Sequence, residues 1–225
     1  MGEKFRLDRF LGECGQGTRS EIKGYIKKGR VTVNGVVAKD NGMKVDTDTD
    51  IVCFNGEEIV YEKFRYFMLN KPQGVVSATR DGISKTVLEL LSGEITEGLF
   101  PVGRLDKDTE GFLLITNDGQ LGHELLSPKK HVGKKYLATV DAPLTEEEMR
   151  TFAEGVDIGD EKKTMPAEIR TVLEDWDDTV YEVILREGRY HQVKRMFEAF
   201  GSTVTYLKRV SMGDVELDPE LQPGE

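Results

Sequence analysis

Apolar residues in the first thirty positions recur at the spacing of one helix face. In the segment 6–13 these positions are Leu7, Phe10 and Leu11. A Gly-Gln-Gly break follows, and Thr18 then stands three residues before Glu21, which is the capping-box pattern that opens a helix. The pattern therefore predicts two short helices, the second of which ends at Gly29.

Short apolar runs separated by Asn-Gly pairs follow these helices. Residues 31–37 are two such runs joined by Asn34-Gly35, and a second Asn-Gly pair follows the run at 51–54. Because Asn-Gly supplies the positive φ angles that a two-residue turn needs, the spacing predicts small β-hairpins. We expect a compact first domain over residues 1–60, a linker at 61–64 and a second domain over residues 65–225.

Longer apolar runs in the rest of the chain predict a larger sheet. The run that starts at Arg65 is halted by Lys71-Pro72, and the alternation at 180–185 is typical of a half-buried strand. Further strands are predicted at 112–116, 134–140 and 204–210, and helices at 86–91, at 121–126, from Thr145 and from about Tyr190. Together these elements predict a two-domain α+β protein.

The composition is that of a globular protein in water. Charged residues make up 32% of the 225 positions, and no apolar run approaches the roughly 18 residues of a membrane span. The amino end also lacks the apolar segment of a signal peptide, so we expect a cytoplasmic protein with no membrane partner. The two cysteines have no Cys-x-x-Cys spacing and the three histidines are dispersed, so the sequence predicts no metal site.

The formal net charge of −10 is unevenly distributed along the chain. Residues 141–178 hold 13 acidic and 4 basic side chains, whereas residues 3–30 hold 8 basic and 4 acidic ones, and residues 186–209 hold 6 basic and 2 acidic ones. Basic patches on an acidic body suit a protein that binds RNA at chosen surfaces and repels it elsewhere. We expect the acidic segment to be a solubilising face, with Trp176 as a packing residue or turn anchor within it.

One polar segment lies between two glycines. The string Gly103-Arg104-Leu105-Asp106-Lys107-Asp108-Thr109-Glu110-Gly111 places three carboxylates and two cations within seven residues, directly before the apolar run 112–116. On charge density alone, the segment is either a catalytic loop or a solvated turn. A loop that feeds a buried strand can hold a carboxylate in a fixed position.

The literal string from Gly103 to Gly119, GRLDKDTEGFLLITNDG, resembles the active-site motif of the pseudouridine synthases of the RsuA type. Residues 65–74 and 189–196 resemble two further motifs of that family, and the segments 19–22 and 29–35 resemble an S4 RNA-binding domain. The resemblance covers nearly the whole chain. It implies an S4-like domain joined to a catalytic domain with a mixed, mainly antiparallel sheet. It also implies isomerisation of uridine to pseudouridine in ribosomal RNA, which requires no metal and no cofactor.

The same resemblance implies a role for five residues. In the family the Asp that follows Arg-Leu is catalytic, which maps onto Asp106. Lys194 takes the place of the basic partner of this Asp, Tyr136 that of the active-site tyrosine, and Leu207 that of the apolar residue beneath the target base. For Tyr136 and Leu207, core packing is the alternative. A target base in folded RNA must be flipped out, and Arg104 takes the place of the residue that fills the vacated stack.

The remaining RNA-binding candidates are also basic. The motif at 65–74 places Lys71 in the pocket wall, and the motif at 189–196 adds Arg189. In the first domain the candidates are Arg19, Lys23, Lys27 and Arg30. Without the S4 resemblance, their helix face is equally well read as a solvated charged surface.

The motifs at 65–74 and 189–196 look closest to the small-subunit branch of the family. The expected substrate is therefore 16S rRNA or a small-subunit assembly intermediate, acted on by a monomer. Relatives that act on 23S rRNA are the first alternative, and a non-catalytic RNA-binding protein of ribosome assembly is the second. The chain ends at Glu225, where members of the family usually continue for a further short segment.

Overall fold

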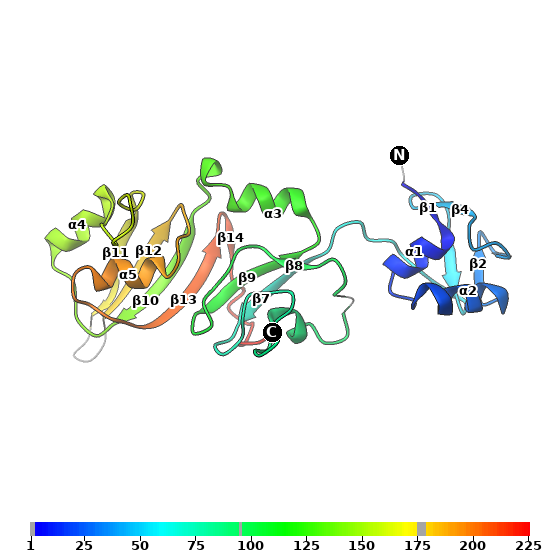
Figure 1. Cartoon of the computed structure of the whole chain (residues 1–225), viewed down its shortest axis with the longest axis horizontal. Coiled ribbons are helices and arrows are strands. Elements are labelled where there is room, and N and C mark those ends of the chain that lie inside the picture. Colours follow the sequence, from blue (N-terminus) through cyan, green and yellow to red (C-terminus); the bar gives the residue numbers. More distant parts are fainter. Residues whose placement is uncertain (1–2, 95, 175–178) are drawn as a thin grey trace. The chain divides into compact units, whose positions relative to one another are not determined.

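The structure is a computed structural model of the chain, and it describes residues 3–94, 96–174 and 179–225 (Figure 1). Trp176, which we expected to pack within the acidic segment, lies outside the described residues. The chain divides into two compact units, Met1–Phe64 and Arg65–Glu225. Within the described ranges, no helix combines the length and the apolar character needed to cross a membrane.

The first unit packs two helices against short strands. Its elements are β1 (Lys4–Arg6), α1 (Leu7–Glu13), α2 (Arg19–Lys27), β2 (Val31–Val33), β3 (Val36–Val37), β4 (Lys44–Asp46), β5 (Val52–Phe54) and β6 (Glu57–Glu58). Strands β3, β2, β5 and β6 form a sheet in that order, and β1 pairs with β4. Asn34 and Asn55 have φ angles of 51° and 53°, as the two Asn-Gly hairpins require. Both helices and both hairpins were predicted, whereas β1 and β4 were not.

Helix α2 begins where its capping box predicts. The Thr18 side chain accepts a hydrogen bond from the backbone N–H of Glu21 at 3.4 Å, and the Glu21 carboxylate accepts one from the N–H of Thr18 at 2.8 Å. Ile22 and Ile26 are buried against the strands, and the basic side chains of the helix stay in solvent. The amphipathic pattern is therefore confirmed.

A buried carboxylate holds the start of α1. Asp8 accepts hydrogen bonds from Arg6 Nε at 3.0 Å, Arg6 Nη2 at 2.8 Å and Asn41 Nδ2 at 2.9 Å. The Arg6 hydrogen bonds are the largest of the causes that lower the pKa of Asp8 to about 2. This cluster fastens the β1–α1 junction to the loop before β4.

The second unit is built on one large sheet. Its elements are β7 (Tyr66–Lys71), the 3-10 helix η1 (Val87–Leu90), β8 (Phe100–Pro101), β9 (Glu110–Thr116), α3 (Gly119–Leu126), the 3-10 helix η2 (Pro128–Lys130), β10 (Lys134–Val140), α4 (Glu146–Glu154), β11 (Glu168–Glu174), β12 (Thr179–Leu185), α5 (Gln192–Glu198), β13 (Val204–Met212) and β14 (Val215–Glu216). The described strands run in the order β11-β12-β10-β13-β9-β7, with β14 beside β13 and β8 beside β9. The pair β13–β9 is parallel and the other pairs are antiparallel. The predicted α+β fold with a mixed, mainly antiparallel sheet is confirmed.

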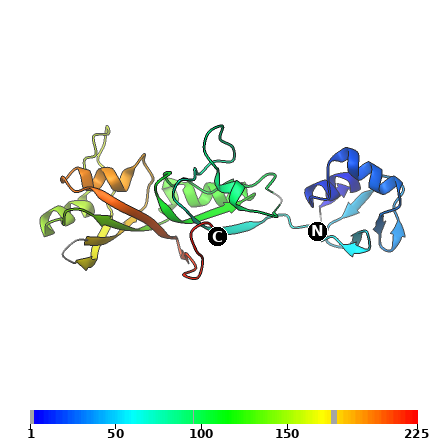
Figure 2. The ribbon, with the colours of Figure 1, turned by 90° about the horizontal axis from the view of Figure 1, so that it is seen from below.

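The two faces of this sheet carry separate apolar clusters. Leu113 and Ile115 of β9 belong to the main core, into which α4 and α5 insert Phe152 and Phe197 with ring centroids 5.5 Å apart. Phe112, on the alternate face of β9, packs with Val102 and Met212 in a smaller cluster. Figures 1 and 2 both show α5 lying along the half of the sheet formed by β10, β12 and β13. Leu125 of α3 packs against the smaller cluster, whereas Val193, Met196 and Phe197 of α5 belong to the main core.

The parallel contact between β9 and β13 depends on a glycine. Gly111 pairs with Arg209 and has a φ of 105°. A Cβ atom at Gly111 would lie 2.1 Å from the carbonyl oxygen of Arg209, closer than any real contact. This close approach joins the polar loop before β9 to the middle of the sheet.

Candidate active site

A cleft of about 660 Å³ lies in the second unit, where the polar loop before β9 meets β10, β13 and the start of α5. Of the predicted site residues, the cleft is lined by Arg104, Asp106, Tyr136, Arg189 and Leu207. Side chains that the sequence analysis did not select also line it, among them Ser77, Lys134, His191 and Arg209. These residues come from five separate parts of the chain and meet at one concave site.

A buried lysine fixes the loop that carries Asp106, residues 103–109, here called the aspartate loop. Lys71 is 0% exposed, and its ammonium group donates to the carbonyl oxygens of Pro72 at 3.0 Å, Asp106 at 3.0 Å and Thr109 at 2.9 Å. Burial lowers the pKa of Lys71 to about 8. Lys71 thus lies beneath the loop, and its three donors are used by backbone carbonyls, which gives it a structural role at the site.

Contacts from the segment after β7 hold the other side of the aspartate loop. The Ser77 hydroxyl accepts from the N–H of Leu105 at 3.0 Å and donates to the carbonyl of Leu105 at 2.9 Å. The backbone N–H of Gly74 donates to the carbonyl of Lys107 at 2.7 Å. With Lys71 beneath and these contacts beside it, the loop holds Asp106 in a fixed place.

Two basic side chains from α5 and the residue before it approach the Asp106 carboxylate. His191 Nε2 lies 3.6 Å from Asp106 Oδ1, and Lys194 Nζ lies 3.9 Å from Asp106 Oδ2. The shortest ion pair of Lys194 is with Asp108 Oδ1, at 2.6 Å. The hydrogen bond from Lys194 lowers the pKa of Asp108. The structure thus brings Lys194 and Asp106 together, with Asp108 as a second and closer partner of the lysine.

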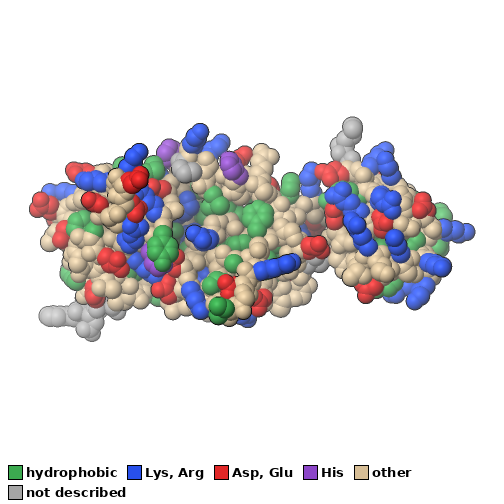
Figure 3. Space-filling model, viewed as in Figure 1, with side chains coloured by type: hydrophobic (Ala, Val, Ile, Leu, Met, Phe, Trp, Pro, Cys, Tyr) green, Lys and Arg blue, Asp and Glu red, His purple; other side chains and the backbone are tan. Residues whose placement is uncertain are grey.

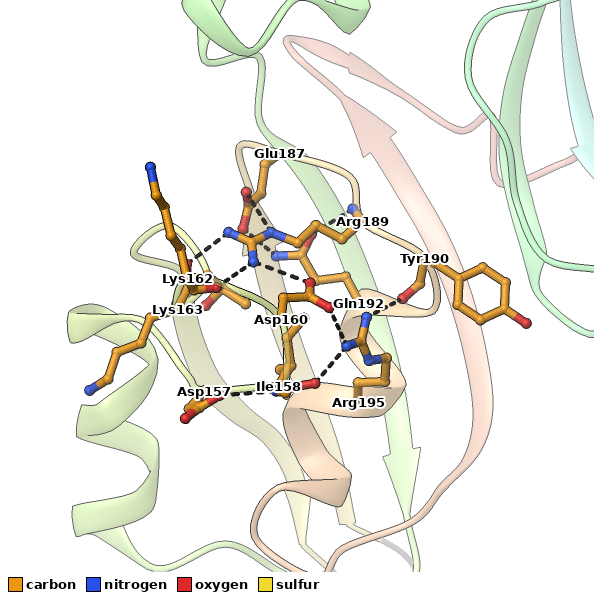
Figure 4. Close-up of polar contacts among 12 residues, drawn as sticks. Asp157, Ile158, Asp160, Lys162, Lys163, Glu187, Arg189, Tyr190, Gln192 and Arg195 are labelled. Atoms are coloured by element: carbon orange, nitrogen blue, oxygen red, sulfur yellow. Dashed lines mark hydrogen bonds and ion pairs between the residues drawn. The ribbon is translucent and has the colours of Figure 1, made fainter.

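A polar network positions the start of α5 (Figure 4). Glu187 Oε1 accepts from Gln192 Nε2 and from the N–H of Met165, both at 2.8 Å, and Arg189 donates its own N–H to Gln192 Oε1 at 2.9 Å. His191 takes the left-handed conformation, with φ 49°, immediately before the helix. Its ring stacks on Tyr190 with centroids 3.8 Å apart, and Tyr190 points away from the network. This conformation brings the imidazole of His191 to Asp106.

Arg189 is part of this network and also lines the cleft. Its guanidinium donates to Glu187 Oε2 at 3.1 Å, Asp160 Oδ2 at 3.3 Å, and the carbonyls of Lys162 at 2.7 Å and Lys163 at 2.8 Å. These four acceptors give the guanidinium a structural role, and the predicted RNA contact of Arg189 stays a prediction. Asp160 also pairs with Arg195 at 2.6 Å, so this part of the acidic segment is structural and not merely solubilising.

The floor of the cleft comes from neighbouring positions of β10 and β13. Tyr136 is opposite Arg209 and Ala138 is opposite Leu207, so these side chains share one face of the sheet. Tyr136 and Leu207 are both nearly buried and belong to the main core while also lining the cleft. Packing and a role at the cleft therefore coexist for both residues.

Two cations on this floor were not predicted as site residues. Lys134 is 7% exposed and Arg209 is 1% exposed, although both line the cleft. Burial, together with the charge of Arg209, lowers the pKa of Lys134. The basic stretch around Lys134 was visible in the sequence, but only the fold shows that Lys134 lines the same cleft as Arg209, 75 positions later in the chain.

The basic candidates of the first unit lie on its surface. Arg19, Lys23 and Lys27 are exposed along α2, and Figure 3 shows Lys and Arg side chains spread over the visible face of this unit. Arg30 lies over the rings of Tyr25 and Phe54, at 4.5 Å and 4.9 Å from their centroids, and donates to Asn55 Oδ1 at 2.7 Å. Its guanidinium thus has a packing role, although the side chain stays exposed.

The arrangement in the cleft suits covalent or electrostatic chemistry by one carboxylate. Asp106 is partly shielded, faces two basic groups, and lies in the same cleft as Tyr136 and Leu207. Such a carboxylate can stabilise positive charge at a sugar carbon or bond to a substrate. In the part of the chain that the structure describes, no three His, Cys, Asp or Glu side chains are grouped as a metal ion requires.

Comparison with known proteins gives a consistent answer over the whole chain. A family model described as RNA pseudouridylate synthase matches residues 65–199, and one described as S4 domain matches residues 5–51. The chain is 50% identical to the Bacillus subtilis (strain 168) protein named uncharacterized RNA pseudouridine synthase YtzG, over 98% of this chain and 92% of that protein. It is 40% identical to ribosomal small subunit pseudouridine synthase A of Escherichia coli (strain K12), over 98% and 94% of the two chains.

A solved structure agrees with these sequence relationships. It is described as a crystal structure of pseudouridylate synthase, is 38% identical in sequence, and superposes with a TM-score of 0.66 over 98% of this chain and 94% of that one. The cleft with Asp106 lies in the unit that the synthase model matches, and the basic helix α2 lies in the unit that the S4 model matches. The chain therefore belongs to the RNA pseudouridylate synthase family and carries an S4 domain ahead of its synthase domain.

Proposed function

We propose that this protein converts one uridine of 16S ribosomal RNA to pseudouridine. The observation that carries the proposal is the fixed position of the Asp106 carboxylate in the cleft, 3.6 Å from His191 and 3.9 Å from Lys194. The choice of 16S rRNA is supported by full-length relatives, 40% identical, that are named ribosomal small subunit pseudouridine synthase A. The substrate is this RNA or an assembly intermediate of the small subunit.

The reaction moves the bond between base and sugar. The N1–C1′ bond breaks, the uracil turns, C5 bonds to C1′, and the hydrogen of C5 is lost while N1 gains one. Asp106 stabilises the electron-deficient sugar, either by its charge or by a transient bond. Lys194 is the cationic partner of this carboxylate, Tyr136 contacts the uracil or the sugar, and Leu207 lies beneath the ring.

RNA binding has two parts in this proposal. Residues 1–60 act as the S4-like RNA-binding domain through Arg19, Lys23, Lys27 and Arg30, residues 61–64 are the linker, and residues 65–225 are the catalytic domain. Arg104 is exposed at the cleft and has no hydrogen-bond partner among the described residues, which leaves its guanidinium free to enter the stack that the flipped base vacates. In this proposal the protein acts as a monomer in the cytoplasm.

Tritium release from 5-³H-uridine tests the proposal, because C5 loses its hydrogen when it bonds to C1′. The substrate is 16S rRNA, both free and in partly assembled particles, and the parent protein is compared with Asp106→Asn. Release by the parent alone supports both the isomerase and the role of Asp106. Release only from 23S rRNA would move the proposal to the large subunit, and no release from either RNA would favour a non-catalytic RNA-binding protein.

A further inference from the structure

The floor of the cleft holds two buried cations without a counter-ion. Lys134 and Arg209 are almost fully buried and both line the cleft. Among the residues that the structure describes, no carboxylate forms an ion pair with either of them, whereas the nearby Lys194, Arg189 and Arg195 all have one. A buried cation is costly unless an anion or polar groups compensate it.

The hydrogen bonds of the two side chains leave donors unused. Lys134 Nζ donates to the carbonyl of Val132 at 3.2 Å, which accounts for one of its three protons. Arg209 Nε donates to the carbonyl of Phe112 at 2.8 Å, and this bond explains how the arginine supports β9. Its Nη2 is buried and has no partner. Backbone carbonyls therefore accept from only some of the donors of Lys134 and Arg209, and one donor of Arg209 is left without an acceptor.

Strand register places the two cations around Tyr136. On β10, Lys134 and Tyr136 are two positions apart and share a face, and Tyr136 is directly opposite Arg209 on β13. The charge of Arg209 contributes to the lowered pKa of Lys134, as expected of two cations that are close together without an anion between them. One anion in this position would interact with both.

We propose that Lys134 and Arg209 form a subsite for a phosphate that flanks the flipped uridine. The inference rests on the proposed function, since a nucleotide in this cleft carries its negative charges on the phosphodiester groups. A phosphate oxygen accepts short, strong hydrogen bonds from ammonium and guanidinium groups, and Arg209 Nη2 is the free donor. Asp106 has basic partners of its own in His191 and Lys194, so it is not the anion that Lys134 and Arg209 lack.

The subsite would act by placing the ribose. Holding one phosphate on the sheet floor restricts where C1′ can lie, and the aspartate loop fixes the carboxylate independently. Loss of the phosphate contact should therefore weaken RNA binding and also slow the step that requires C1′ at Asp106.

The test combines a protein variant with a chemically altered RNA. Lys134→Gln removes one charge at the first residue of β10. Its matched control is Lys135→Gln, because Lys135 projects from the opposite face of the strand and pairs with Glu182 at 4.0 Å and Glu216 at 3.7 Å. The RNA is a fragment that contains the modified uridine, with a neutral methylphosphonate in place of either the 5′ or the 3′ phosphate of that nucleotide. Affinity and single-turnover rate are measured for each combination.

The proposal predicts a specific non-additivity. Lys134→Gln should lower rate over affinity by about 10- to 100-fold, the range expected for a hydrogen bond to a charged group, and Lys135→Gln by less than about 3-fold. At one of the two linkages, the methylphosphonate should lower rate over affinity of the parent and of Lys135→Gln by about 10- to 100-fold, as the Lys134→Gln change itself does. In Lys134→Gln, which already lacks the contact, the same methylphosphonate should lower it by less than about 3-fold. Equal effects on all three proteins at both linkages would overturn the subsite.

Tritium release from the unmodified RNA distinguishes failure of the proposed function from failure of the phosphate subsite. If 16S rRNA releases no tritium but another rRNA does, the protein variants and the methylphosphonate substitutions are compared on a fragment of that RNA. If none does, the salt dependence of RNA binding decides. Lys134→Gln should lower the slope of log affinity against log salt by about 0.7 to 0.9 relative to Lys135→Gln, the change expected for one phosphate contact. Identical slopes would refute the subsite in that case.

Discussion

Replacing Lys194 by Met tests whether the positive charge of Lys194 supports the action of the Asp106 carboxylate in the reaction. The two charged groups are 3.9 Å apart, and the Asp106 side chain is 31% exposed. Two unit charges 4 Å apart interact by about 4 kcal/mol at an effective dielectric constant near 20. We reduce this to about 2 kcal/mol for solvent screening at a partly exposed carboxylate, which corresponds to a rate loss of about 30-fold. We therefore expect Lys194→Met to keep its fold and to lose about that factor in single-turnover rate.

Asp108 provides the matched comparison. It is the closer partner of Lys194, at 2.6 Å, but its side chain is 69% exposed, and ion pairs at such sites contribute about 1 kcal/mol or less. Asp108→Asn leaves Lys194 with Asp106 as its remaining carboxylate. We expect it to retain the parent rate within about 3-fold, since it removes no charge that faces the substrate.

The assay is tritium release under single-turnover conditions with enzyme in excess, which separates the chemical step from product release. Lys194→Arg serves as a second control because it keeps a cation at the same place, and it should recover most of the loss. The reasoning is refuted if Lys194→Met reacts at the parent rate. It is also refuted if Asp108→Asn is as slow as Lys194→Met, because the exposed pair would then be the important one.

Three further predictions concern stability. Since its partners lower the pKa of Asp8 from 3.8 to about 2, Asp8→Asn should reduce the unfolding free energy by about 2 kcal/mol at pH 7, and the difference should disappear in urea titrations as the pH falls from about 4 towards 2. Burial lowers the pKa of Lys71 from 10.5 to about 8, so the unfolded chain holds that proton more tightly; the parent should gain about 3 kcal/mol relative to Lys71→Met as the pH rises from about 8 to 10.5, and a constant difference would contradict this. Gly111→Ala should cost at least about 4 kcal/mol because its Cβ would meet the Arg209 carbonyl at 2.1 Å, whereas Gly119→Ala, with nothing within 4 Å, should change thermal stability by less than about 1 kcal/mol.

Local features of the fold could be predicted from the sequence because their causes are local. The capping box of Thr18 and Glu21, the Asn-Gly hairpins and the strand at 134–140 each depend on residues within a few positions of one another. The pairing of β1 with β4 could not be predicted in this way. Each strand has only three residues, and about forty residues separate them, so neither carries a periodic pattern long enough to detect.

The position of Asp106 could be anticipated, but its surroundings could not. The polar loop before an apolar strand, together with the motif resemblance, was sufficient to select Asp106. The identity of the cations around it depends on contacts between distant segments. Lys194 is 86 residues from Asp108, and the conformation of His191 that brings it to Asp106 is imposed by a polar network that includes Asp160.

Lys71 and Arg189 have structural roles that the sequence did not reveal, for a common physical reason. Each is a cation within a motif of the cleft, and a sequence does not show whether a cation is already neutralised by its own chain. Lys71 is used by three carbonyls, and Arg189 by Glu187, Asp160 and two carbonyls. Both side chains shape the site by holding its backbone in place.

The net charge of −10 is therefore a poor guide to RNA binding in this protein. Some of the acidic side chains form ion pairs within the protein; Asp160, for example, pairs with both Arg189 and Arg195. Among the described residues, the cations that line the cleft without a carboxylate partner are Arg104, Lys107, Lys134 and Arg209. Removing an internally paired cation should therefore alter stability more than the salt dependence of RNA binding, whereas removing the exposed Arg104 should do the reverse.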